Sequence, residues 1–265
     1  MSIPVDLSPE AIESRLTSRV IGRPLRVVEE TSSTNDAVMA AGHAGEPEGL
    51  AILADRQTSG RGRRGRSWAS LPGVGIWTSI LLRPPVSPLQ APLLTLMAGL
   101  ATAEAIASVA RVEPLLKWPN DLLLDGRKVV GILTEMTTTG QRIGHVAVGI
   151  GINVHQRRED FPESVRETAT SIDLAAGCRV DRGEVAATLY DSLDRWYAAV
   201  CGDGTSMILQ AARARTATLG KPVMVDTGEE KWQGTAVDLD EDGALLVVDA
   251  RGAIQRVLAA DVSIR

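Results

Sequence analysis

The sequence predicts an α+β protein: a mixed, mostly antiparallel sheet with helices on one side, followed by a small C-terminal β-barrel. Three observations favour this fold class. Apolar runs typical of strands recur up to residue 154, separated by turn residues. Residues 89–110 carry the longest helical pattern of the chain. Beyond residue 217, short strand patterns follow one another with only turns between them, which is typical of a small barrel.

The first elements alternate between helix and strand. Residues 9–19 show a short amphipathic helix pattern, and residues 25–30 are typical of a strand. Ser33, Thr34 and Asn35 are polar residues of the kind that cap helix N-termini. We therefore expect them to open the Ala-rich helix that follows.

Two further strands flank an unusual loop. Residues 49–55 predict a buried strand, and residues 74–82 alternate well enough to predict another. Between them, residues 56–67 are rich in glycine and arginine and have no apolar period. Such a segment is a loop rather than an element.

A long helix and an antiparallel meander come next. Residues 89–110 predict the helix, and residues 115–118 a strand that runs into a Pro-Asn-Asp turn. Residues 122–124 and 128–136 predict a hairpin across an Asp-Gly turn, and residues 145–154 predict another strand.

The rest of the chain changes character twice. Residues 155–170 are irregular and charged, whereas residues 183–200 predict a helix with one apolar face. The C-terminal strand patterns are KPVMV, WQGTAVDL, ALLVV, IQRVL and VSI. We expect three parts: an N-terminal extension over 1–24, a main α+β domain over 25–216, and the barrel over 217–265.

Composition excludes several classes of protein. The 265 residues are 44% hydrophobic and 23% charged, as in ordinary globular proteins. The net charge of −5 provides no global attraction to nucleic acid. Cys178 and Cys201 cannot form a disulfide framework or a zinc cluster, and none of the three histidines lies in an HExxH motif. With no secretory signal pattern and no run of about 18 apolar residues, we expect a cytoplasmic protein with no membrane partner.

The segment over residues 60–66, GRGRRGR, is the most unusual in the chain. It contains GxGxxG, but a dinucleotide fingerprint must open a helix, and here a strand follows. A nucleic-acid-binding loop, a solvated loop and an anion-binding loop remain open. In an anion-binding loop, backbone N–H groups and guanidinium groups would bind a phosphate or a carboxylate.

Two other clusters carry candidate chemistry. Lys117 and Lys128 are two of only four lysines, and the alternation of a hairpin can place both on one side of the sheet. They are also compatible with exposed strand ends. Asp121 is either a turn former or a ligand of Mg²⁺. Gly149 and Gly151 interrupt a strand, which indicates a bulge, close packing, or the close approach of a ligand.

Five motifs in this order and spacing resemble the biotin protein ligase family. The family has two-step chemistry and needs no P-loop and no protein nucleophile, consistent with the absence of GxxxxGK[ST] and GxSxG from this chain. The resemblance covers residues from about 25 to the end. The motifs are Ser33-Thr34-Asn35, residues 57–68, residues 117–121, residues 126–133 and residues 149–153.

The resemblance implies a fold and a reaction. The fold is a catalytic domain like that of class II synthetases, with an SH3-like barrel. In the reaction, the carboxylate of biotin attacks the α-phosphate of ATP and forms biotinyl-5′-AMP. This adenylate then acylates one lysine of a biotin carboxyl carrier domain. The implied cofactors are ATP and Mg²⁺, with biotin as the substrate.

The resemblance also implies roles for residues. Lys128, Arg63 and Lys117 are the implied catalytic cations, and Asp121 is the implied Mg²⁺ ligand. The implied biotin site is Ser33, Thr34, Asn35, Gln57, Gly60, Arg61, Gly62, Arg63, Lys128 and Gly149. The implied ATP and adenylate site is Arg63, Arg64, Trp68, Lys117, Asn120, Lys128, Gly151 and Asn153.

Two segments are expected to cover the ligands. The glycine- and arginine-rich loop lacks apolar anchors, so we expect it to be mobile when empty and to close over biotin or the adenylate. The stretch 155–168, with Phe161, is the expected second lid over adenosine. Some family members stack a tryptophan on adenine near the end of this stretch, but the matching position here is near Thr170.

The expected partners follow from the same resemblance. Only about 24 residues precede the catalytic domain, which predicts a monofunctional ligase that does not bind DNA, as a monomer or a homodimer. The alternatives are a lipoate or octanoate ligase, a biotin or adenylate sensor without activity, and an RNA-binding protein with an arginine-rich loop. Salt-dependent retention on heparin would separate the last from the others.

Overall fold

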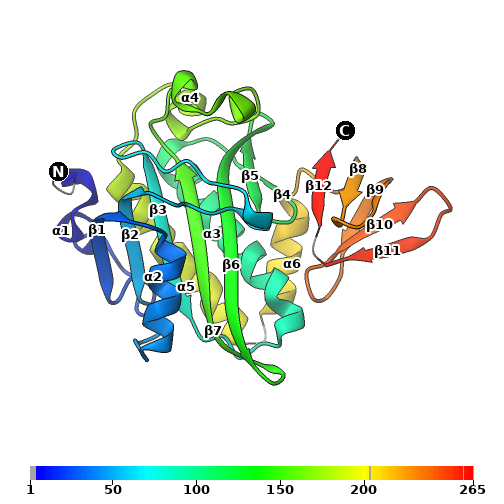
Figure 1. Cartoon of the computed structure of the whole chain (residues 1–265), viewed down its shortest axis with the longest axis horizontal. Coiled ribbons are helices and arrows are strands. Elements are labelled where there is room, and N and C mark those ends of the chain that lie inside the picture. The colour runs from blue at the N-terminus through cyan, green and yellow to red at the C-terminus, as the bar shows by residue number, and fades with distance from the viewer. Residues whose placement is uncertain (1–3, 203, 259, 265) are drawn as a thin grey trace.

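The computed structural model describes residues 4–202, 204–258 and 260–264 (Figure 1). Its larger sheet has seven strands in the order β1-β2-β3-β7-β6-β5-β4. Only β1 and β2 are parallel, which confirms the mixed, mostly antiparallel sheet. The strands are β1 (Leu25–Thr31), β2 (Ala51–Gln57), β3 (Gly75–Leu82), β4 (Leu115–Lys117), β5 (Asp121–Leu124), β6 (Arg127–Thr139) and β7 (Arg142–Asn153).

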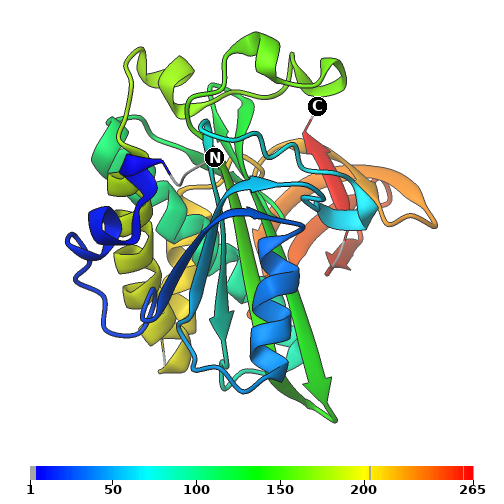
Figure 2. The same cartoon turned by 60° about the vertical axis from the view of Figure 1, so that its left-hand side comes forward.

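Helices cover both faces of this sheet, so the expectation of helices on one side is wrong (Figures 1 and 2). On one face, α2 (Thr34–His43) packs over the centre of the sheet. On the other face lie α3 (Ala91–Ala110), α5 (Arg182–Cys201) and α6 (Thr205–Ala214). All eight residues of β3 are buried, because alternate side chains point toward the two helical layers. Sequence alternation alone does not reveal a second layer.

The N-terminal segment is bound to α5. Its helix α1 (Pro9–Glu13) is shorter than the predicted helix over residues 9–19. After it, the chain turns so that the carboxylates of Asp191 and Asp194 on α5 accept hydrogen bonds from backbone N–H groups of residues 17–21. Four apolar side chains of the segment are buried: Leu7, Ile12, Leu16 and Ile21.

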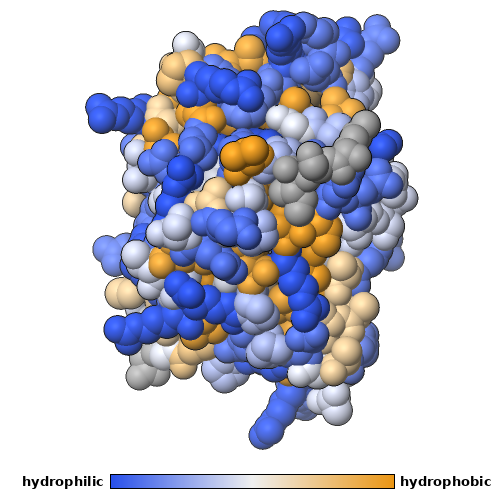
Figure 3. All heavy atoms as spheres, turned by 90° about the vertical axis from the view of Figure 1, so that its left-hand side faces the viewer, coloured by the Kyte–Doolittle hydropathy of each residue, from blue (hydrophilic) through white to orange (hydrophobic). Residues whose placement is uncertain are grey.

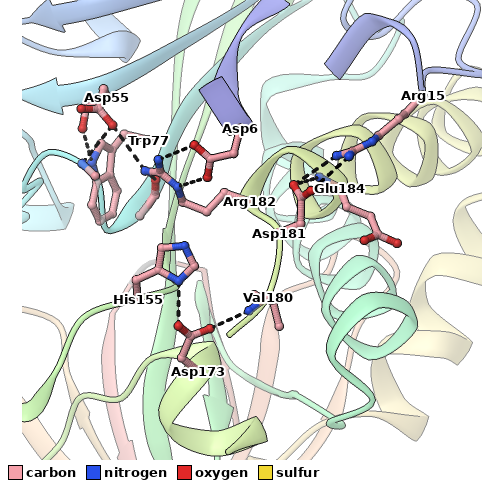
Figure 4. A network of polar contacts seen from close by, with 12 residues as sticks. Asp6, Arg15, Asp55, Trp77, His155, Asp173, Val180, Asp181, Arg182 and Glu184 are labelled. Carbon is pink, nitrogen blue, oxygen red and sulfur yellow. Dashed lines mark hydrogen bonds and ion pairs between the residues drawn. The ribbon is translucent and has the colours of Figure 1, made fainter. Parts of the chain in front are cut away.

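A buried arginine joins this segment to the sheet (Figure 4). Arg182, whose side chain is 2% exposed, donates two hydrogen bonds to Asp6 and one to Asp55. Asp55 also accepts from the backbone N–H of Gly73, and its carbonyl accepts from the indole N–H of Trp77. One guanidinium group therefore links the N-terminal segment, α5 and the edge of the ligand cavity described below.

The C-terminal unit is a five-stranded antiparallel sheet, as predicted for the barrel. Its order is β11-β10-β9-β8-β12. It packs against the larger unit, with the Trp118 indole donating to the carbonyl of Gly243 at 3.1 Å. The strands are β8 (Pro222–Asp226), β9 (Lys231–Leu239), β10 (Leu245–Asp249), β11 (Ile254–Val257) and β12 (Asp261–Ile264).

The longest apolar helix belongs to the core. One helix among the described residues, over 88–110, is long and apolar enough to cross a membrane. However, 72% of its most apolar window is buried, so α3 is a core helix.

The face that bears the N-terminal segment shows polar side chains interspersed with apolar ones (Figure 3). The one-turn helix α4 (Ile172–Ala176) is too short to produce a helical period in the sequence.

Candidate active site

A cavity of about 390 Å³ opens on the α2 side of the larger sheet. Its floor comes from β6 and β7, and its walls come from the start of α2, the loop after β2 and the segment after β7. Fourteen of the residues predicted for the site line this cavity. They are Ser33, Thr34, Asn35, Gln57, Arg61, Gly62, Arg63, Trp68, Asn120, Asp121, Lys128, Gly149, Gly151 and Asn153.

Three predicted residues lie beside the cavity wall rather than on it. A Cβ on Gly60 would lie 2.5 Å from the carbonyl oxygen of Trp68, so this glycine permits a tight loop. Arg64 extends to the C-terminal sheet, where it donates to the carbonyl of Asp226 at 2.7 Å. Lys117 lies behind Asp121, with 3.7 Å between the ammonium and carboxylate groups.

One end of the cavity is a connected polar wall. Thr34 donates to the side-chain oxygen of Gln57 from both its backbone and its hydroxyl group, at 2.9 and 3.1 Å. The Ser79 hydroxyl lies 2.7 Å from the Thr34 hydroxyl and 2.6 Å from the Asn35 amide oxygen, and it donates its one hydrogen to one of these two acceptors. The amide of Asn35 donates to Glu135 at 2.6 Å. The helix does begin at Thr34, as predicted, but its Ser33 N-cap makes no side-chain capping bond, so the Ser33 hydroxyl is not used to cap the helix.

Sequence reasoning missed Ser79 and Glu135. Ser79 is the buried hydroxyl beside Thr78 in the apolar strand β3, and a polar residue in a strand buried on both faces is a signal. Glu135 gave no such signal, because β6 is partly exposed at its far end and an acidic residue there is ordinary.

Glycines make the floor flat. A Cβ on Gly149 would lie 2.1 Å from the amide oxygen of Asn35. A Cβ on Gly151 would lie 2.6 Å from the indole nitrogen of Trp68, and one on Gly131 would lie 2.7 Å from the same ring. Gly131 and Gly151 are register partners on β6 and β7. These glycines thus allow side chains to lie directly against the sheet.

The centre of the cavity is cationic. Lys128 lies 2.5 Å from Asp121, and its ammonium group is 5.2 Å from the centre of the Trp68 ring. Arg63 donates to Asn120 and to the carbonyl of Ala260, both at 3.2 Å. Burial holds the pKa of the Arg63 guanidinium below its usual value. The positive charges of Arg64 and Arg66 also lower this pKa, whereas the negative charge of Asp261 raises it. An anion bound here would relieve this repulsion.

The acidic side chain of this cluster already has cationic partners. Asp121 faces both Lys117 and Lys128, and the described residues contain no group of three or more His, Cys, Asp or Glu side chains able to hold a metal. A single carboxylate paired with two lysines does not form a resident magnesium site. Asp121 as a magnesium ligand therefore stays a prediction, and the pairing favours it as the counter-ion of the lysines.

The arginine-rich loop is anchored through its charges. Arg61 contacts Asp36 at 2.5 Å and Glu135 at 2.9 Å, and Arg66 contacts Asp261 at 2.9 Å. We expected the loop to be mobile because it lacks apolar anchors. The structure adds that ion pairs bind the loop at both ends. Its closure over a ligand stays a prediction.

The segment after β7 forms the other end of the cavity. Phe161, Val165 and Ala169 line it, and the backbone of Lys128 is hydrogen-bonded to Thr168 and Thr170 at 2.7 and 2.9 Å. This pairing joins the expected second lid to β6. Gln156 also lines the cavity, and the sequence analysis did not single it out.

Comparison with known proteins agrees with this fold and site. Residues 27–153 match the Biotin/lipoate A/B protein ligase family, and residues 218–265 match the Biotin protein ligase C terminal domain. The chain is therefore a member of the biotin protein ligase family.

Individual relatives cover nearly all of the chain. It is 35% identical to the bifunctional ligase/repressor BirA of Bacillus subtilis, over 98% of this chain and 80% of that protein. It is also 35% identical to the biotin–[acetyl-CoA-carboxylase] ligase of Mycobacterium tuberculosis, over 97% and 96%. The structure of the Aquifex aeolicus biotin protein ligase with biotin and ATP is similar at 32% identity, with a TM-score of 0.78 over 91% of this chain and 98% of that one.

Proposed function

We propose that this protein joins biotin to ATP, forming biotinyl-5′-AMP and pyrophosphate, and then transfers the biotinyl group to a lysine of a biotin carboxyl carrier domain. The observation that carries the proposal is a cationic centre in a cavity with one polar end, at the start of α2, and a different end formed by the segment after β7. Gly149 and Asn153 are four residues apart on β7, which is about 13 Å of strand. That length suits an extended ligand with biotin at one end and adenosine at the other.

The polar wall would hold biotin. The ring system of biotin is largely apolar but carries a polar ureido edge, which is costly to bury without partners. Thr34, Asn35 and Gln57 supply hydroxyl and amide groups that are already oriented by Ser79 and Glu135. A pre-oriented wall loses little entropy when the ligand binds.

The cationic centre would carry the first chemical step. A carboxylate oxygen of biotin attacks the α-phosphorus of ATP, and the bond from that phosphorus to the bridging oxygen of the β-phosphate breaks. Both reactants are anions, so fixed cations lower the barrier most where the charges approach. Lys128 and Arg63 line the cavity at this point, while Lys117 supports them through Asp121. ATP would bring Mg²⁺ as part of the substrate.

The second step would need no nucleophile from this chain. The neutral amine of the carrier lysine attacks the carbonyl carbon of the mixed anhydride, the bond to the phosphate oxygen breaks, and AMP leaves. The protein's contribution is to position the reactants and to exclude water from the anhydride.

We also propose a cytoplasmic location, no membrane partner, and a monomer or homodimer. We propose no nucleic-acid partner either, consistent with the net charge of −5.

Biotin-dependent exchange of pyrophosphate into ATP, measured with Mg²⁺, tests the proposal. We expect exchange with biotin, with Lys128→Ala and Arg63→Ala each lowering kcat/KM by about 100-fold or more. Lys221→Ala, at an exposed lysine of the C-terminal unit, is the matched control and should behave like the wild type. Exchange with lipoate or octanoate instead would reassign the substrate. Biotin binding without exchange would indicate a sensor.

A further inference from the structure

Arg182 is a buried cation that the proposed reaction does not use. It is the first residue of α5, where the helix dipole disfavours a positive charge, and its side chain is only 2% exposed. Burying a charged group costs free energy that ion pairs only partly return, so a well-packed hydrophobic side chain is often at least as stabilising. The contacts of Arg182 therefore call for an explanation other than stability.

The guanidinium group divides its contacts between two parts of the molecule (Figure 4). On one side it donates to both carboxylate oxygens of Asp6, at 2.8 and 2.9 Å. On the other side its Nη1 donates to the carboxylate of Asp55 and to the carbonyl of Gly75, both at 3.3 Å. These two acceptors lie near the end of β2 and at the start of β3. Arg182 therefore joins two neighbouring strands next to the cavity wall.

The contacts of Asp55 continue to Trp77, a buried residue that lines the cavity. The Asp55 carboxylate accepts from the backbone N–H of Gly73 at 2.9 Å, and its carbonyl accepts from the indole N–H of Trp77 at 3.1 Å. The same indole N–H lies 3.2 Å from the carbonyl of Leu71. Backbone groups from both sides of the loop after β2 thus hold one ring in place.

Trp77 supports the cationic centre through Trp68. The two indoles meet edge to face, with 6.4 Å between the ring centres and 72° between the ring planes. The ammonium group of Lys128 lies 5.2 Å from the centre of the Trp68 ring. A shift of Trp77 would therefore move the ring against which the central cation lies.

We propose that Arg182 is a positioning residue for the adenylation step, acting through Asp55 and Trp77 on the cationic centre. This inference rests on the proposed function and adds a residue behind the cavity wall to those that line it. The alternative is a purely structural role, in which Arg182 only fastens the N-terminal segment to α5. The two roles can be separated, because only the first requires the contact with Asp55.

Three variants of the full-length protein separate the two roles. Arg182→Met removes the guanidinium group at similar length. Asp55→Ala removes only the carboxylate on the cavity side and keeps the pair of Arg182 with Asp6, so it decides the question if the stronger change prevents folding. Arg15→Met is the matched control. Arg15 also joins the N-terminal segment to α5, by a pair with Asp181 at 3.0 Å, on the side away from Trp77 (Figure 4).

Two measurements are made on each protein, after urea unfolding has shown that it is folded under the assay conditions. Biotin-dependent exchange of pyrophosphate into ATP gives kcat and the KM values for biotin and ATP. Fluorine NMR of protein labelled with fluorotryptophan gives one resonance for each of the five tryptophans. Each resonance is assigned by replacing one tryptophan with phenylalanine.

We expect Arg182→Met and Asp55→Ala to lower kcat at least about tenfold, because a misplaced cation affects the approach of the reacting groups. The KM values for biotin and ATP should change by less than about threefold, because the residues at both ends of the cavity are kept. The resonances of Trp68 and Trp77 should shift or broaden in both variants. The resonances of the other three tryptophans, and the whole spectrum and kcat of Arg15→Met, should stay as in the wild type.

A wild-type kcat in folded Asp55→Ala would overturn the proposal and leave Arg182 a structural role. Equal shifts of all five resonances would overturn it as well, as would a loss of kcat in Arg15→Met as large as that in Asp55→Ala. Absence of exchange in the wild type would overturn the proposed function. If Trp68 and Trp77 still respond to Asp55→Ala in that case, the positioning of the two indoles by Arg182 and Asp55 stands.

Discussion

Trp68 lies flat on the sheet because two neighbouring strands lack a side chain there. Gly151 and Gly131 are register partners, and a Cβ on either would come within 2.7 Å of the indole. Since the ammonium group of Lys128 lies 5.2 Å from the centre of this ring, the glycines also determine where the central cation sits. A substitution at Gly151 or Gly131 would therefore displace Trp68, and through it the ammonium group of Lys128.

Gly151→Ala should displace Trp68 and Lys128. Overpacking of this kind costs about 1–3 kcal/mol of unfolding free energy, and we expect kcat/KM for exchange to fall by more than about tenfold. Gly202→Ala is the control, because its Cβ would meet nothing closer than 3.5 Å. Urea unfolding and exchange assays on both variants check this. Equal effects of the two substitutions would refute the packing argument.

At the scale of elements, the arginine-rich loop is bound to the C-terminal sheet. Asp261, at the start of β12, lies 2.9 Å from Arg66, 3.7 Å from Arg64 and 4.0 Å from Arg63. One carboxylate therefore serves three arginines of a loop that forms a wall of the cavity. Pairs this exposed contribute little to global stability, but they restrict where the loop can go.

Asp261→Asn should free the loop without unfolding the protein. We expect trypsin to cleave within residues 61–66 at least about threefold faster, with a change in unfolding free energy below about 1 kcal/mol. Asp238→Asn removes a different ion pair of the C-terminal sheet, with Arg213, and should leave cleavage of the loop unchanged. Timed digestion followed by mass spectrometry measures both rates. A loop that stays equally resistant would mean that other contacts hold it.

Local chemistry made some elements predictable. Asp125 and Gly126 adopt positive φ values of 49° and 76°, which is why an Asp-Gly pair between alternating runs predicted the hairpin correctly. The length of α1 was not predictable, because the carboxylates that bind the following residues lie about 174 positions away. The same holds for Arg182, whose partners Asp55 and Asp6 lie 127 and 176 positions away.

At the scale of the whole molecule, a buried histidine ties stability to pH. The Nδ1–H of His155 donates to the carboxylate of Asp173 at 2.7 Å, beside the Arg182 network (Figure 4). Burial holds the pKa of His155 below its usual value, despite the opposing effect of Asp173. Burial, together with His43 and Arg83, also lowers the pKa of His145. As pH falls below about 6.5, the unfolded chain takes up protons that the folded protein does not, so folding becomes less favourable.

The melting temperature should therefore fall between pH 7.5 and 5.5. We expect a drop of roughly 3 °C or more for the wild type and a smaller drop for His155→Asn, whose amide does not titrate. Scanning calorimetry at several pH values gives the two slopes. At pH 7.5 His155→Asn serves as its own control, because any packing loss appears there as a constant offset. Parallel slopes would exclude His155 as the source.

The attachment of the N-terminal segment to α5 has a consequence for synthesis of the chain on the ribosome. Leu7, Ile12, Leu16 and Ile21 emerge long before α5, whose Asp191 and Asp194 carboxylates bind the backbone of residues 17–21 and are made about 170 residues later. At about 5–20 residues per second, that separation lasts roughly 10–35 s. During this interval four apolar side chains have no native surface to cover them. A chaperone that shields nascent chains would find a binding site there.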